Sequence, residues 1–246
     1  LIHVNQISDK LQAALDKRTF ATVKAGEVIG RSPAFDFAVY NNNITLNFVN
    51  AETYEAEPWK IHTDDLFAHF TEHIRTQLLD KNLRKAEPRT GKLDYDIDGT
   101  LAGNWFVENT NGYQGKPEYQ RLIGYWTTHL AFVYDQVDPN VIIVSMGDYG
   151  GNTGHYAVKG NTPDPAKVST NNELVKYELV KFNYFDNGNV WNMAQYADLS
   201  VKAYNTIEGV ALVQMIEDRK IRFESFPGKT ASQVSGFTSN AKIYTR

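Results

Sequence analysis

The pattern His69-x-x-Glu72-His73 comes closer than any other in this sequence to a catalytic metal site. On a helix, His69 and His73 would stand one turn apart and share a metal, with Glu72 beside it as a general base. Asp65 would lie one turn further back on the same side. The alternative is the solvated face of an amphipathic helix, because the apolar stripe that contains Leu66 marks the opposite face. We expect the solvated face, with zinc at His69 and His73 as the alternative.

Two later stretches also carry polar groups. His129 in residues 129–139 is followed by Asp135 and Asp138, and a histidine beside a carboxylate can do acid–base chemistry. In an alternating strand, however, such a histidine is usually half-buried and satisfied by hydrogen bonds. The glycine-rich residues 148–165 offer oxygen ligands that suit calcium, but without the regular Asp spacing of a calcium loop. We therefore expect a mobile surface loop there and no resident cofactor, with zinc and calcium as the possible ions.

Composition limits the remaining chemistry. The 246 residues include no cysteine, which excludes disulfides, thiolate catalysis and Cys-ligated zinc. The net charge is −4 with acids and bases interspersed, and no basic stripe is available to replace the counterions of a nucleic acid. No run approaches the roughly 18 apolar residues of a membrane span. Because the sequence begins at Leu1 rather than at methionine, we expect a further segment upstream.

The first third of the sequence predicts a mixture of elements. Residues 1–20 have apolar residues at helical spacing and Ser8 as a candidate N-cap. Residues 35–40 and 44–50 alternate as two strands joined by an Asn-rich turn. Residues 63–83 carry a helical apolar stripe, which predicts one continuous helix. The charged residues 85–99, which contain a proline and a glycine, predict a linker.

Residues 100–246 predict short strands separated by turns. The Asp-Asn-Gly-Asn sequence at 186–189 is a strong hairpin signal. Short strands at this spacing are typical of an antiparallel barrel or sandwich. The predicted strands cover residues 102–109, 128–135, 140–147, 174–185, 210–217 and 220–227.

Residues 1–50 resemble the later half of the lysostaphin-like zinc endopeptidases, which cut peptide cross-links in bacterial cell walls. Ile-His-Val-Asn-Gln-Ile at 2–7 is similar to the family strand that carries a catalytic histidine, so His3 would match it. Val-Lys-Ala-Gly-Glu-Val-Ile-Gly at 23–30 is similar to the family's hairpin. Ala34 and Asp36 stand where the family has a catalytic and a zinc-binding histidine. A catalytic zinc needs three protein ligands, so the resemblance implies a degenerate site with Asp36 as the candidate ligand.

Gly-Asn-Trp at 103–105 resembles the Gly-x-Trp that opens the first strand of lipocalin-type barrels. In that family a late basic residue packs over the tryptophan, so Arg219 or Arg222 would match it. The resemblance implies an eight-stranded barrel. Its interior would bind a small apolar ligand near Trp105 and Arg222.

Together these observations predict a mainly β protein with a degenerate peptidase-like domain at 1–84, a linker at 85–99 and an antiparallel barrel or sandwich at 100–246. We expect an exported, non-catalytic binding, structural or assembly protein in the periplasm, on the cell surface or outside the cell. Its partner would be another protein, a cell surface or a second copy. One alternative is a zinc metallopeptidase of cell-wall peptides, with ligands partly supplied by the upstream segment. The other is a lipocalin-like carrier of a small apolar molecule.

Overall fold

The structure of the protein is a computed structural model. The chain forms two compact units, Leu1–Val39 and Tyr40–Arg246, so the division falls ahead of the predicted linker at 85–99. The structure describes residues 6–24, 26–31, 37–55, 57–116, 124–193 and 196–246.

The first unit contains the predicted short helix, α1 (Asp9–Asp16), whose N-cap is Ser8. The Ser8 hydroxyl accepts a hydrogen bond from the Leu11 amide at 3.3 Å, as the sequence predicts. Strand β1 (Gln6–Ile7) pairs antiparallel with β2 (Gly30–Arg31). The peptidase-like residues His3, Ala34 and Asp36 lie outside the described residues, so the zinc site at Asp36 stays a prediction.

In the first part of the second unit, the predicted strand at 44–50 is wrong: these residues belong to no strand or helix, and short helices begin at Ala51. The backbone amides of Asn47 and Val49 donate to the carboxylates of Asp94 and Asp96, at 2.9 and 3.2 Å. Side chains of the predicted linker thus take the place of a partner strand. The helices of this part are η1 (Ala51–Tyr54), η2 (Pro58–His62), η3 (Leu66–His69) and α2 (Glu72–Asp80).

The prediction of one continuous helix over 63–83 is wrong. The Asp65 carboxylate accepts from the Phe67 amide at 2.8 Å and caps the 3-10 turn η3. Phe70 and Thr71 are then extended, and Thr71 is the N-cap position of the separate helix α2. A local side-chain cap therefore starts a short turn that the apolar stripe did not indicate.

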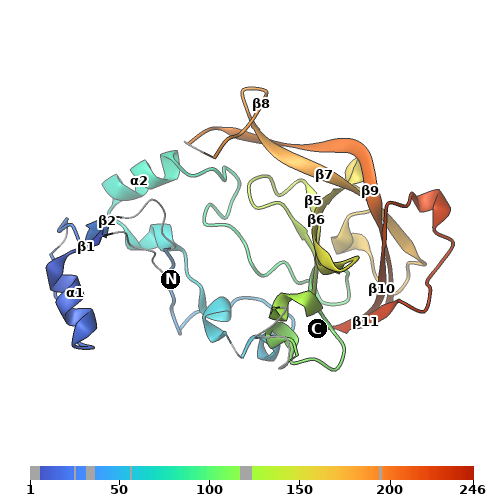
Figure 1. Ribbon diagram of the computed structural model, residues 1–246, viewed down its shortest axis with the longest axis horizontal. Coiled ribbons are helices and arrows are strands. Elements are labelled where there is room, and N and C mark those ends of the chain that lie inside the picture. Colours follow the sequence, from blue (N-terminus) through green and yellow to red (C-terminus); the bar gives the residue numbers. More distant parts are fainter. Residues whose placement is uncertain (1–5, 25, 32–36, 56, 117–123, 194–195) are drawn as a thin grey trace. The chain divides into compact units, whose positions relative to one another are not determined.

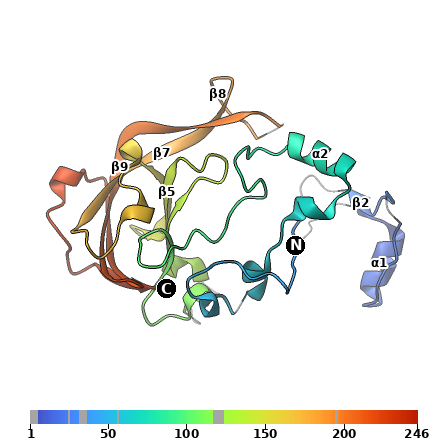
Figure 2. The ribbon, with the colours of Figure 1, turned by 180° about the vertical axis from the view of Figure 1, so that it is seen from behind.

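Eight strands between residues 103 and 245 form a closed antiparallel barrel, which is one of the two predicted alternatives (Figure 1, Figure 2). Each strand pairs with the next, and β11 pairs with β3 to close the ring. The eight barrel strands are β3 (Gly103–Val107), β4 (His129–Tyr134), β5 (Ile142–Tyr149), β6 (Asn152–Val158), β7 (Val175–Asp186), β9 (Leu199–Glu217), β10 (Lys220–Pro227) and β11 (Lys242–Thr245). Because the ring is closed, each of the eight strands has a paired neighbour on both sides within the ring.

The predicted hairpin at 186–189 is confirmed. Strand β8 (Asn189–Val190) pairs with the end of β7, and the turn residues Asn187 and Gly188 have φ of 47° and 84°. The prediction of a mobile loop over 148–165 is wrong for β6, which is a barrel strand. Single 3-10 turns lie in the remaining loops, at η4 (Gly112–Gln114), η6 (Tyr125–Thr128), η7 (Lys159–Asn161), η8 (Pro165–Lys167) and η9 (Ala231–Gln233).

Buried apolar side chains fill the interior of the barrel. Alternate residues of each strand point inward, and Trp105, Phe132 and Tyr177 are fully buried there. Burying a side chain of this size contributes about 1.5–3 kcal/mol. Other members of this cluster include Leu130, Val144, Leu179, Val213, Ile221, Phe223 and Tyr244.

Trp105 and Arg246 close one end of the barrel. The Arg246 guanidinium lies 4.1 Å from the Trp105 ring centre. It donates to the carbonyls of Ala102 at 2.6 Å, Ile97 at 2.7 Å and Thr100 at 2.6 Å. These carbonyls belong to the turn that leads into β3, so one side chain ties the last strand to the start of the first.

The predicted partners of Trp105 lie elsewhere. The Arg222 guanidinium lies 4.5 Å from the centre of the Phe237 ring. Arg219 forms an ion pair with Asp98 at 2.8 Å. The basic residue over the tryptophan is therefore Arg246, which follows a strand that the sequence did not predict. Among the described residues, no helix is long and apolar enough to cross a membrane.

Candidate functional site

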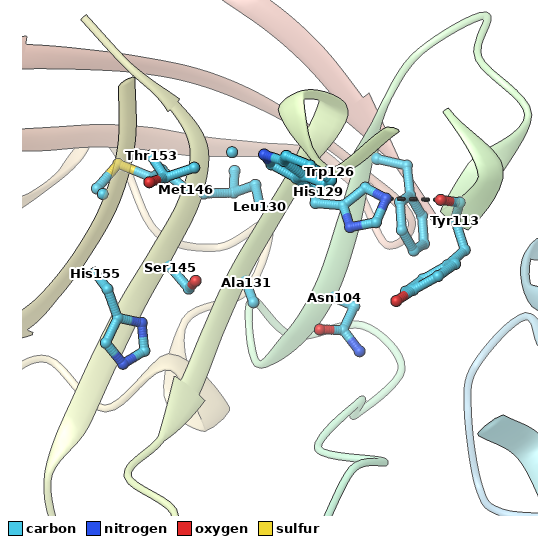
Figure 3. Close-up of a pocket in the computed structure, with 13 residues that line it drawn as sticks. Asn104, Tyr113, Trp126, His129, Leu130, Ala131, Ser145, Met146, Thr153 and His155 are labelled. Carbon is cyan, nitrogen blue, oxygen red and sulfur yellow. Dashed lines mark hydrogen bonds between the residues drawn. The ribbon is translucent and has the colours of Figure 1, made fainter. Parts of the chain in front are cut away.

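A groove of about 290 Å³ lies on the outer face of strands β3 to β6. The strand register places Asn104, Ala131, Ser145 and His155 side by side in one row across the four strands. Figure 3 shows this row, with Asn104 at one end and His155 at the other. All four face away from the barrel interior, because their neighbours Trp105, Leu130, Met146 and others point inward.

Small residues at the centre of the face create the hollow. Ala131, Ser145 and Gly147 have little or no side chain, while larger groups rise on both sides of them. Gly147 also permits a close approach, since a Cβ there would collide with the carbonyl oxygen of Trp126. The residues that line the groove are Asn104, Phe106, Tyr113, Trp126, His129, Leu130, Ala131, Ser145, Met146, Gly147, Thr153, Gly154 and His155.

Aromatic rings form the wall beside β3. The ring centres of Phe106 and His129 are 5.1 Å apart at an interplanar angle of 86°, and those of Tyr113 and His129 are 4.7 Å apart. The hydrogen bond between Tyr125 and Tyr113, together with burial, raises the pKa of Tyr125 to about 12. Trp126 continues the wall with its side chain 47% exposed. In the wall of the groove, the rings of Phe106, Tyr113 and His129 thus pack on one another, whereas the Trp126 ring is accessible to a ligand.

His129 is held neutral within this wall. Its Nε2 lies 2.8 Å from the carbonyl oxygen of Tyr113 (Figure 3). Because a carbonyl only accepts, Nε2 carries the proton and Nδ1 is left as an acceptor. Burial lowers the pKa of His129 to about 4. Partial burial also lowers the pKa of His155, although that ring remains open to solvent.

The low pKa of His129 predicts a stability change with pH. In the unfolded chain His129 takes up a proton below pH 6.5, whereas in the folded protein it stays neutral to about pH 4. The unfolded state therefore binds more protons in this window, and the contribution of His129 to the free energy of unfolding falls by about 3 kcal/mol between those values. Urea unfolding of the wild type and of His129→Gln should show a steeper pH dependence in the wild type. Equal slopes from pH 6.5 to 4 would contradict a buried neutral imidazole.

A second hollow of about 530 Å³ adjoins the groove at the barrel rim. Trp126, Gly147 and Thr153 line both hollows. The rim hollow also carries charge, for Lys242 forms an ion pair with Asp148 at 2.7 Å. A ligand that passes Trp126 would therefore move from a neutral surface to a charged one.

Of the predicted metal residues, His69 and His73 have separate partners. His69 ends η3 and its Nε2 lies 3.0 Å from Asp64, whereas His73 lies in α2 with its Nε2 2.8 Å from the Gln77 amide nitrogen. The break at Phe70 removes the one-turn spacing that the motif needs. Among the described residues, no three His, Asp or Glu side chains converge as metal ligands.

The predicted ligand-binding residues Trp105 and Arg222 do not contact each other, and Asp135 does not pair with His129. Trp105 is buried in the packed interior, and Arg222 stacks on Phe237 instead of reaching it. Asp135, the predicted carboxylate near His129, accepts from the Tyr184 hydroxyl at 2.7 Å and the Val137 amide at 2.8 Å.

Sequence reasoning found His129 as a candidate but missed its neighbours in the groove. Asn104 and Ser145 lie at outward positions of predicted strands, and that alternation was the available signal. His155 lies in β6, a strand that was read as a loop. Because β6 was not predicted as a strand, the row formed by Asn104, Ala131, Ser145 and His155 could not be recognised from the sequence.

No family model, curated protein or solved structure matches this chain. The fold and the site therefore define its class: an antiparallel eight-stranded β-barrel with a packed interior and a neutral, aromatic-walled groove on its outer face.

Proposed function

We propose that this chain is a non-catalytic binding protein whose outer-face groove takes a neutral carbohydrate. The observation that carries the proposal is the chemistry of the lining. Among the described residues that line the groove, none is Asp, Glu, Lys or Arg, and His129 is neutral at pH 7. A ligand without formal charge is favoured there, since a charged ligand would lose hydration without gaining an opposite charge.

The rings and the polar groups suit a sugar together. The apolar face of a pyranose can pack on an aromatic ring such as that of Trp126, which is half exposed. Neutral polar side chains then fix its orientation through hydrogen bonds to hydroxyl groups. Asn104, Ser145 and the acceptor Nδ1 of His129 provide such groups in the groove.

The lining also supports binding without hydrolysis. Cleavage of a glycosidic bond commonly uses two carboxyl groups on opposite sides of the bond, and the described groove residues provide none. Ser145 and His155 are cross-strand neighbours, but a nucleophile and its base also need a third group to orient the base. Asp135, the carboxylate that interacts electrostatically with His155, is already bound by Tyr184 and two backbone amides.

The adjoining rim hollow favours an extended ligand. Trp126 lines both hollows, so an oligosaccharide chain can run from the groove past Trp126 toward Lys242. A carbohydrate on a cell surface agrees with the exported location predicted from the sequence. The packing of the Arg246 guanidinium over the Trp105 ring supports kinship with lipocalin-type barrels. The proposed ligand lies on the outer face, because side chains fill the barrel interior.

The test is a screen of neutral oligosaccharides on a glycan array, followed by calorimetry. We expect Trp126→Ala to weaken the affinity for the best ligand at least tenfold, which corresponds to about 1.4 kcal/mol. Trp59→Ala is the matched control, since Trp59 is an exposed tryptophan (40%) of η2 that does not line the groove. It should leave the affinity unchanged.

Three outcomes would overturn the proposal. One is the absence of binding to any neutral glycan at millimolar concentration. Another is equal loss in the Trp126→Ala and Trp59→Ala variants, which would place the ligand elsewhere. The third is turnover of the bound glycan, which would contradict a purely binding role.

A further inference from the structure

The indole of Trp126, in the η6 turn (Figure 3), rests on Gly124. A Cβ atom on Gly124 would lie 2.3 Å from both Cη2 and Cζ2 of the indole and 2.4 Å from its Cε2. These atoms are consecutive members of the six-membered ring, and a point at nearly equal distance from all three lies over the ring face, not beside its edge. Gly124 therefore covers one face of the indole. Because Trp126 is 47% exposed, the other face is the one open to a ligand.

Hydrogen bonds hold Gly124 in this position. It is the N-cap residue of η6, and its carbonyl accepts from the Thr127 amide at 3.4 Å and from the Thr127 hydroxyl at 3.1 Å. Its φ of +87° is a conformation that L side chains rarely adopt. Glycine at this position is therefore favoured for two separate reasons, the backbone conformation and the contact with the indole.

The backbone of Trp126 is fixed as closely as its ring. A Cβ atom on Gly147 of β5 would lie 1.7 Å from the Trp126 carbonyl oxygen, so the turn lies directly against the strand. The rings of Tyr125 and Trp126 pack edge to face, with ring centres 5.5 Å apart at an interplanar angle of 73°. These contacts, together with Gly124, hold the indole in one orientation.

We propose that Gly124 is a positioning residue of the groove, which presents Trp126 to the ligand as a platform formed before binding. The inference rests on the proposed carbohydrate-binding function and adds how the affinity arises. A ring that is already fixed in its bound orientation loses little rotamer freedom when a ligand packs on it, so ordering of this side chain does not oppose binding. Since Gly124 covers one face of the indole, the sugar packs on Trp126 from a single side.

Gly124→Ala would move the ring while leaving the turn in place. The new methyl group must displace the indole, and because Trp126 is almost half exposed, the ring can turn toward solvent. Gly188→Ala is the matched control, since Gly188 has a similar φ of +84° but a Cβ there would meet nothing within 4 Å. Both variants carry backbone strain of the same kind, but only Gly124→Ala displaces the indole.

Fluorine NMR of the protein labelled with fluorotryptophan observes the ring directly. The chain has four tryptophans, and the resonance lost in Trp126→Phe identifies Trp126. We expect this resonance to shift in Gly124→Ala while the other three stay in place. In Gly188→Ala the Trp126 resonance should not move. An unchanged Trp126 resonance in a folded Gly124→Ala variant would overturn the inference, whether or not a glycan binds.

Calorimetry with the best neutral glycan tests the effect on affinity. We expect Gly124→Ala to weaken binding by about tenfold, and Gly188→Ala to leave it unchanged. The double variant Gly124→Ala/Trp126→Ala should bind no more weakly than Trp126→Ala alone, because Gly124 acts through that ring. Additive losses in the double variant would contradict the positioning role. Absence of glycan binding by the wild type would refute the proposed function and the effect on affinity, but not the ring orientation, which the NMR measurement decides separately.

Discussion

Replacing Arg246 with alanine is expected to lower the free energy of unfolding by about 3–5 kcal/mol. The guanidinium donates to three carbonyls of the turn at residues 97–102 and covers the face of Trp105. Its removal takes a charged donor from all three carbonyls, although those of Ala102 and Ile97 also accept from backbone amides, and opens space above a buried ring. Because Arg246 follows β11 and its acceptors precede β3, the loss also weakens the junction that closes the barrel. Urea unfolding followed by tryptophan fluorescence measures the change.

Two variants test whether the several N–H donors of the Arg246 guanidinium account for the loss of stability. Arg246→Lys keeps the charge but cannot reach three carbonyls at once, so we expect about half of the alanine effect. Arg222→Ala removes another arginine that lies over an aromatic ring, that of Phe237, and should cost much less. If Arg246→Ala and Arg222→Ala were equally destabilising, the closing role of Arg246 would be wrong.

The strands of the barrel were largely predictable because their alternation is local. Periodicity located most of β3, β4, β5, β7 and β10, and the Asn-Gly turn after Asp186 fixed the β8 hairpin. Strand β6 was missed because Gly154 and the polar residues around it lack a regular apolar pattern. Gly154 occurs there because a side chain would collide with Tyr149, Tyr156 and Met146, a packing fact that a sequence does not display.

The candidate site was less predictable, because it depends on register. Alternation says which face a residue occupies, but not which residue of the next strand stands beside it. Asn104, Ala131, Ser145 and His155 form a row only through the pairings of four strands. Arg219 or Arg222 was predicted over Trp105 because the resemblance to lipocalin-type barrels implies a late basic residue there. A basic residue at the end of the last strand was needed, and β11 had not been recognised.

The glycine of the Gly-x-Trp sequence provides the second large prediction. Gly103 has φ of +122°, which L side chains rarely adopt, and a Cβ there would collide with the carboxylate and Cα of Asp96. The Arg246 Nη1 atom would be 2.8 Å away. Backbone strain of about 1–3 kcal/mol and overpacking of similar size add to about 2–6 kcal/mol for Gly103→Ala. Urea unfolding should detect this loss as a lower midpoint.

Gly188→Ala separates the two causes. Gly188 also has positive φ, +84°, but a Cβ there would meet nothing within 4 Å. Its variant reports the strain alone, so the difference between the two alanine variants measures the crowding around Asp96 and Arg246. Because Asp96 also accepts from the Asn104 amide at 2.9 Å, its displacement by the new methyl group would disturb the first groove strand as well. Gly103→Ala should therefore weaken the proposed glycan binding, whereas Gly188→Ala should not. Equal destabilisation by both substitutions would mean that backbone strain alone selects glycine at position 103.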